Sequence, residues 1–142
     1  MQAPAQIKGT SAVLAEFGGA WPSFHDAEIV RFGLDRGDFT PERKVVAELR
    51  VHVRRYESRG AGTIDYHQAL VKSVLIDLRF SGVEDLSVSD FNCQNVIDDI
   101  VLSADEENGR VAVEISGIYG LDGRWTCDYA KVVRVSRGAG EV

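Results

Sequence analysis

The feature of this chain that most constrains its fold is a regular alternation of apolar and other residues over long segments. In the clearest segment, 45–54, every second position is apolar, and these positions are Val45, Ala47, Leu49, Val51 and Val53. Successive side chains of a β-strand point to opposite faces, so a period of two predicts a strand with one buried face and one face in water. Segments 70–80 and 110–116 repeat the pattern. Half-buried strands of this kind are typical of antiparallel sheets.

The same reasoning predicts seven strands in meander order. They are expected near residues 27–35, 45–56, 69–80, 84–90, 95–104, 110–118 and 124–136. Asn108-Gly109 and Asp122-Gly123 are pairs that tight reversals prefer, so a hairpin is expected at each. Segment 95–104 is ambiguous, because its apolar residues also fit one face of a helix. Its β-branched residues favour a strand.

Helical character is expected only near the amino terminus. Ser11 to Phe17 is predicted to form a short helix that begins at Thr10 or Ser11 and ends at Gly18-Gly19. No linker, repeat or low-complexity tract divides the sequence, so residues 1–142 are expected to form a single domain. The predicted fold class is therefore mainly β, or α+β with little helix. We expect an antiparallel β-meander sheet or a two-layer sandwich with a short N-terminal helix.

Composition excludes several classes of protein. Hydrophobic residues make up 44% of the chain and charged residues 27%, as in an ordinary globular domain. The first twenty residues show no signal peptide or membrane-spanning segment, so the expected location is cytoplasmic. Cys93 and Cys127 stand apart without a CxxC motif or a histidine at ligand spacing, and no metal or cofactor site is predicted from them.

Negative charge is concentrated in one stretch of the sequence. Between Asp77 and Glu107 the chain carries nine acidic residues and one base, Arg79. Residues 1–71 carry nine bases and nine acids, and residues 72–142 carry seven and thirteen, which gives charges of 0 and −6. A localised anionic surface attracts positive partners and repels polyanions, so a basic protein is a better candidate partner than nucleic acid. The candidate partner-binding residues are Glu84, Asp85, Asp90, Asp98, Asp99 and Asp105.

A second candidate site is the polar and aromatic segment Trp21-Pro-Ser-Phe-His-Asp-Ala-Glu28. His25 and Asp26 form a pair of the kind found in metal phosphohydrolases, although such sites need further histidines at defined spacing. Packing is the favoured interpretation, in which Trp21 and Phe24 close one end of the core and His25 and Asp26 fix the entry to the first strand.

Four segments of the second half of the chain share a pattern with a known family. They are Leu78-Arg-Phe-Ser-Gly-Val-Glu-Asp-Leu-Ser-Val88, Asp90-Phe-Asn-Cys-Gln-Asn-Val-Ile97, Gly109-Arg-Val-Ala-Val-Glu-Ile-Ser-Gly117 and Trp125-Thr-Cys-Asp-Tyr-Ala-Lys-Val-Val-Arg-Val135. Over residues 78–135 the chain resembles the immunity protein 50 family, small bacterial proteins that neutralise the toxin domains of polymorphic toxin systems. Asp90-Phe91 stands where the family pattern has Gly-Trp. The resemblance implies a protein that acts by binding, so no catalytic residues carry over.

Together these observations predict a non-catalytic, immunity-type protein that binds and neutralises a cognate, basic toxin domain through an acidic surface. We expect no cofactor, no nucleic-acid partner and no membrane partner. Two alternatives stay open: a small enzyme or metal-binding domain that uses His25 and Asp26, and a ligand-binding β scaffold with an apolar cavity. The sequence sets neither the identity of the toxin nor the oligomeric state.

Overall fold

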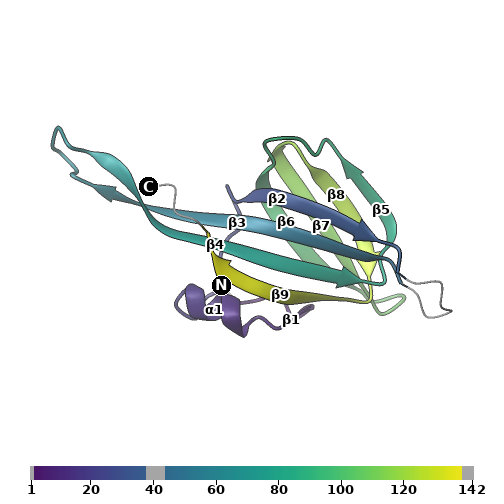
Figure 1. Cartoon of the computed structure of the whole chain (residues 1–142). Coiled ribbons are helices and arrows are strands. Elements are labelled where there is room, and N and C mark those ends of the chain that lie inside the picture. The colour runs from purple at the N-terminus through teal and green to yellow at the C-terminus, as the bar shows by residue number, and fades with distance from the viewer. Residues whose placement is uncertain (1, 38–43, 139–142) are drawn as a thin grey trace.

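The alternating segments form a nine-stranded sheet in the computed structural model, which describes residues 2–37 and 44–138 (Figure 1). The elements in chain order are β1 (Ile7–Lys8), α1 (Ser11–Glu16), β2 (Glu28–Asp35), β3 (Val46–Arg59), β4 (His67–Ser81), β5 (Glu84–Ser89), β6 (Val96–Asp105), β7 (Arg110–Tyr119), β8 (Asp122–Cys127) and β9 (Tyr129–Arg137). The mainly β fold class with one short N-terminal helix is confirmed. Segment 95–104 is a strand, β6. Among the described residues, no helix has the length and apolar content required to cross a membrane.

The order of the strands in the sheet is β1-β9-β4-β3-β2-β6-β7-β8-β5, which differs from a single meander. Neighbours in sequence do pair within β2-β3-β4 and within β6-β7-β8. However, β5 pairs with β8 rather than with β4, and β9 pairs with β4 rather than with β8. The predicted strand 124–136 is therefore two strands separated at Asp128, whose amide donates to the carbonyl of Ser81 at 2.7 Å. Among the described strands, β1 is the one parallel neighbour, paired with β9.

The sheet folds over itself, so that its two halves enclose a common core. We call β1, β9, β4, β3 and β2 the first half-sheet and β6, β7, β8 and β5 the second. Trp125 on β8 lies 5.0 Å from Phe80 on β4 and 6.0 Å from Phe32 on β2 between ring centroids. Phe80 and Trp125 are at most 2% exposed. Each large side chain buried in this way contributes about 1.5–3 kcal/mol to folding.

The two half-sheets are joined by a short ladder between β2 and β6. The strands share one paired position, Glu28 with Val96. Around it, the amide of Asp26 donates to the carbonyl of Ile97, and the amide of Ile97 donates to the carbonyl of Ala27. Asn95, 3% exposed, fixes this end of the molecule: its Nδ2 donates to the carbonyls of Ile29 and Asn92, and its Oδ1 accepts from the amides of Asn92 and Leu121.

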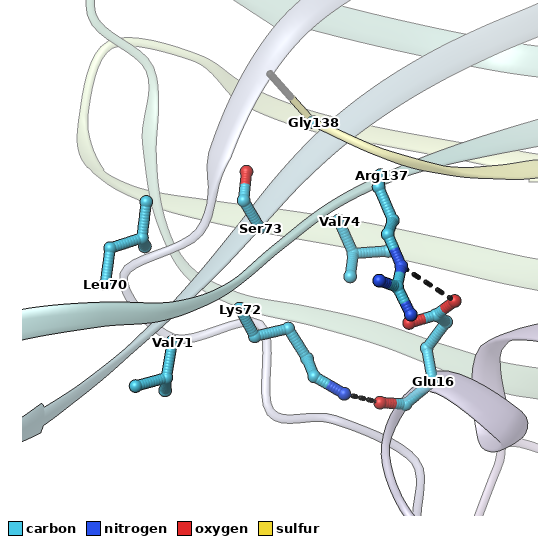
Figure 2. A pocket seen from close by; sticks show the side chains of 8 residues that line it. All are labelled: Glu16, Leu70, Val71, Lys72, Ser73, Val74, Arg137 and Gly138. Carbon is cyan, nitrogen blue, oxygen red and sulfur yellow. Dashed lines mark hydrogen bonds and ion pairs between the residues drawn. The ribbon is translucent and has the colours of Figure 1, made fainter. Parts of the chain in front are cut away.

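The helix α1 begins and ends close to the predicted residues. The backbone at Gly18 and Gly19 has positive φ angles of 65° and 87°, which glycine adopts without strain and which end the helix. Val13 is fully buried, and the ammonium of Lys72 donates to the carbonyl of Glu16. Figure 2 shows Lys72 and Arg137 both reaching Glu16 in a surface pocket of about 300 Å³. These contacts hold α1 against β4 and β9.

One of the two predicted hairpin turns is displaced. Asn108-Gly109 lies in the turn between β6 and β7, as predicted, and Gly109 has a φ of 69°. Between β7 and β8 the reversal is made at Gly120, with a φ of 77°, whereas Asp122 and Gly123 already belong to β8. At position 123 glycine serves packing rather than a turn, because a Cβ there would lie 3.3 Å from the side chains of Trp125 and Val88. The prediction chose Asp122-Gly123, three residues after Gly120, because Asp-Gly is a common sequence for a tight turn.

The hairpin of β3 and β4 projects beyond the rest of the sheet (Figure 1). Pairing of β3 with β2 ends at His52, and pairing of β4 with β9 ends at Val74, whereas β3 and β4 pair with each other as far as Arg59 and His67. We call residues 55–72 the arm. Three of its apolar or aromatic residues are more than half exposed: Tyr56, Ile64 and Tyr66.

Candidate functional site

The outer face of the second half-sheet carries much of the acidic character of the chain. Residues directly opposite each other in antiparallel strands share a face. Two rows of three residues, Val101–Glu114–Arg124 and Ser103–Ala112–Thr126, run across β6, β7 and β8 on the side away from the core. By the same register, five acidic residues belong to this surface, which we call the acidic face: Asp85, Asp99, Asp105, Glu114 and Asp122.

The acidic face has a mixed lining of charged, small and apolar side chains. A groove of about 340 Å³ lies over it, lined by residues that include Asp85, Val101, Glu114 and Arg124. Val101 is 49% exposed at its centre. Two bases lie on the face, Arg124 and Arg110, and Arg110 is turned to the end of the sheet, where its guanidinium binds Asp128 at 2.8 Å. Among the described residues, none of the five acids of the acidic face has an ion pair.

The outer face of the first half-sheet carries the opposite charge. Two of its acids form ion pairs, Asp77 with Arg50 at 2.8 Å and Glu48 with Arg79 at 3.0 Å, and by register Glu28 and Asp35 lie on the same side. Further bases then lie on the same side by register: Arg31, Arg54, Lys131 and Arg134. Bases therefore outnumber acids on this outer face, whereas acids outnumber bases on the acidic face.

The six predicted acidic residues do not gather at one place. Asp85, Asp99 and Asp105 lie on the acidic face. Glu84 begins β5 with its carboxylate 3.9 Å from Arg110, and Asp90 lies in the loop after β5 with a positive φ of 62°. Asp98 is an extra residue in a β-bulge between Ile97 and Asp99, and this bulge separates it from Asp99. Glu114 and Asp122 lie on the acidic face although they fall outside the acidic stretch 77–107.

Asp98 is instead brought to the second candidate cluster. The imidazole Nδ1 of His25 lies 3.2 Å from both the carbonyl and the carboxylate of Asp98, and its Nε2 lies 3.6 Å from Asp26. The hydrogen bond to the Asp98 carbonyl and the charge of Asp26 raise the pKa of His25 above its ordinary value of 6.5. Asp26 has a positive φ of 67°. His25 therefore links the segment that enters β2 to the bulge of β6.

Trp21 and Phe24 occupy the positions that the packing interpretation gives them. They are 4% and 6% exposed and their rings meet edge to face, with centroids 5.8 Å apart. His25 and Asp26 are exposed next to them. Within residues 2–37 and 44–138, no group of three or more His, Cys, Asp or Glu side chains could hold a metal ion.

The two cysteine thiols give little support to a catalytic role. Burial raises the pKa of Cys127 to about 11, whereas Cys93 is exposed, and both are free. The space between the half-sheets is filled by Trp125 with Phe80 and Phe32, as expected of a packed core rather than of a ligand-carrying scaffold.

A cluster that sequence reasoning missed joins the half-sheets at the end opposite to Asn95. Asp128, between β8 and β9, accepts hydrogen bonds from Lys44 at 2.7 Å and from Arg110 at 2.8 Å. The hydrogen bond from Lys44, with the charges of Lys44 and Arg110, holds the pKa of Asp128 below its ordinary value of 3.8. Gly82 has a φ of 71°, and a Cβ there would lie 2.2 Å from the Asp128 carboxylate. Sequence periodicity gives no signal for this contact, because its members lie on separate strands and connections.

Comparison with known proteins gives the class to which this architecture belongs. Neither the curated proteins nor the solved structures contain a match to the chain. The family model of immunity protein 50 matches residues 9–138, which extends the resemblance of residues 78–135 to the Trp21–Glu28 segment, the arm and both half-sheets. A match over nearly the whole chain includes the acidic face, the His25 cluster and the joints between the half-sheets, and it places this protein in the immunity protein 50 family.

Proposed function

We propose that this protein neutralises a cognate toxin domain by binding it, without catalysis, and that the acidic face is the surface that makes contact. The proposal combines family membership, which indicates a toxin-binding immunity protein, with one observation on the surface itself. Five acidic side chains lie on one outer face with no ion pair among the described residues, and they outnumber the two bases of that face.

The charge of the face indicates the chemistry of the partner. A carboxylate without an ion partner costs little free energy while it is exposed to water. It gains the most interaction energy when a cationic surface approaches. The toxin surface is therefore proposed to be basic, as is the case for enzymes that bind phosphate groups. Attraction between such surfaces raises the association rate above the range of about 10⁵–10⁷ M⁻¹s⁻¹ that is typical of uncharged interfaces.

The acidic residues at the centre of this proposed contact surface differ from those expected from the sequence. Asp99 and Glu114 flank the exposed Val101, the first on the same strand and the second directly opposite it. Asp85 and Asp105 extend the acidic face toward the ends of β5 and β6. Asp98 is placed at the margin, because its carboxylate lies against His25. An apolar centre with a charged surround is the usual anatomy of a protein interface.

The compartment proposed for this interaction is the cytoplasm. Cys93 and Cys127 are both free, and free thiols of this kind persist in a reducing environment.

The test is co-expression with the toxin domain encoded by the adjacent gene, scored by rescue of growth and by co-purification. The variant is D99K with E114K. Its matched control is E57K with D65K, which makes the same change of charge on exposed positions of the arm. We expect the acidic-face variant to lower the association rate about tenfold or more at low salt and to weaken its dependence on salt. Equal rates for the two variants would contradict the assignment of the acidic face.

A further inference from the structure

The strand β6 has an open edge on one side. Along Val96–Asp105 it pairs with β7. On its other side β2 pairs with it only at Val96, and among residues 2–37 and 44–138 no other strand continues that pairing. Beyond the joint, β2 stays paired with β3, so β2 and β6 separate. An unpaired strand edge presents backbone N–H and C=O groups that can hydrogen-bond a further strand.

The direction of the backbone groups can be read from three hydrogen bonds. The amide and carbonyl of Ile97 face β2, where they bind Ala27 and Asp26. The bulge at Asp98 shifts the alternation by one residue. The amide of Ile100 donates to the carboxylate of Asp99 at 2.9 Å, so it also points away from β7. The period of two then places the amides of Leu102 and Ala104 on the same open side.

The open edge is regular and accessible. Its pairing with β7 runs without a register shift from Ile100 to Asp105, whereas the other outer strand of this half-sheet, β5, is interrupted between Glu84 and Ser87. Ala104 is exposed although its side chain belongs to the inner face. Leu34 on β2 is 53% exposed. The edge is therefore in solvent toward Ala104, whereas Ile100, nearer the joint with β2, is 9% exposed.

The charges along the open edge favour a basic strand as its partner. Asp98, Asp99 and Asp105 lie along the edge strand, so an added strand with lysine or arginine side chains would meet opposite charges. A second copy of this chain fits poorly. Antiparallel pairing of two β6 edges centred on Leu102 would place Asp99 of one copy against Asp105 of the other. Like charges on an edge strand are a known protection against self-pairing.

We propose that the toxin domain adds a basic β-strand to the open edge of β6, hydrogen-bonded to the backbone of Ile100, Leu102 and Ala104. This inference rests on the proposed function and specifies the structural element of the partner. Strand addition supplies affinity through main-chain hydrogen bonds, and the carboxylates beside the edge supply selectivity for a basic strand.

The test is amide hydrogen exchange measured by NMR on the free chain and on its complex with the toxin domain encoded by the adjacent gene. We expect exchange of the Leu102 and Ala104 amides to slow at least about tenfold in the complex. A paired variant test uses A104P and A104V. Proline removes the amide that points to the open side and also fixes φ at about −65°, whereas valine keeps the amide, so A104P should bind about tenfold or more weakly than A104V.

The outcomes separate the two proposals. Growth rescue with unchanged exchange at Leu102 and Ala104 would overturn strand addition and leave the acidic face as the contact. Absence of both rescue and complex would overturn both proposals. Protection of these amides in a dimer of the free chain would show that a second copy is the occupant and overturn the inference. If A104P fails to fold, as judged by its melting curve, amide hydrogen exchange at Leu102 and Ala104 in the native complex tests the proposal on its own.

Discussion

At the scale of single residues, the fold depends on polar side chains buried where strands from different parts of the chain meet. Asn95 is the clearest case, because each of its side-chain atoms serves two backbone groups, on β2, on its own loop and on the turn after β7. Gly120 belongs to the same place, since a Cβ there would lie 2.5 Å from the Asn95 amide oxygen.

We predict that N95A lowers the free energy of unfolding by about 2–4 kcal/mol, because it leaves several buried backbone groups without partners. The neighbouring Asn92, whose side chain is exposed and bonds only within its own loop, provides the control: N92A should cost less than about 1 kcal/mol. Urea denaturation of both variants measures the difference. Equal costs would show that Asn95 does not hold the joint.

The pH dependence of stability has a predicted sign at His25. Its pKa is raised in the folded state, so protonation stabilises the fold fully below the ordinary value of 6.5, and this stabilisation is lost as the pH rises through the folded pKa. We expect H25Q to lower the urea midpoint more at about pH 5.5 than at about pH 8.5. A deficit that is the same at both pH values would refute a folded-state interaction of the imidazolium with Asp98 and Asp26.

At the scale of elements, the arm is the part of the sheet with least support. In the part of the chain that the structure describes, no third strand lies beside β3 and β4 beyond His52 and Val74, and two-stranded ribbons are marginally stable in water. The alternation of apolar residues fades at the same point, as Tyr56 and the residues after it are exposed. The length of the arm thus comes from hairpin pairing rather than from the core.

Shortening the arm is predicted to leave the domain folded. Glu57 and Ala69 lie directly opposite each other, so Asn-Gly in place of residues 58–68 can close the hairpin with a tight turn. We expect the free energy of unfolding to change by less than about 1 kcal/mol, since no buried side chain is removed. Thermal melting and toxin co-purification check this. Loss of neutralisation with the melting temperature intact would assign binding to the arm instead of the acidic face.

At the scale of the whole molecule, two half-sheets are closed by polar joints at both ends. The joint at Asp128 holds a guanidinium, that of Arg110, which is 16% exposed. The residues of this joint and of the joint at Asn95 both lie within the range 9–138 that the family model matches.

We predict that D128N lowers the free energy of unfolding by about 1–3 kcal/mol, because the largely buried Arg110 would lose the nearer of its two charge partners and keep only Glu84 at 3.9 Å. The control is E48Q, which removes an equally charged partner from the more exposed Arg79 and should cost less than about 1 kcal/mol. Urea titration at neutral pH gives both values. The advantage of the native chain over D128N should also shrink as the pH falls below 3.8, through the lowered pKa of Asp128.

The period-two pattern of the sequence determined the strands, because alternate burial along a sheet requires alternate apolar side chains. It located the cores of β2 to β7 and the region of β8 and β9, while the glycine pair after Phe17 gave the end of the helix. The segments shared with the immunity protein family gave the class to which the chain belongs.

Only the tertiary structure decided which strands are neighbours, because pairing of β9 with β4 and of β5 with β8 depends on contacts between residues distant in sequence. The same holds for the surface. One bulge at Asp98 separates it from Asp99, and register places Glu114 and Asp122 on the same face as Asp99. Charge density along the sequence cannot reveal such an arrangement, since a single extra residue in a strand exchanges the faces of every side chain that follows.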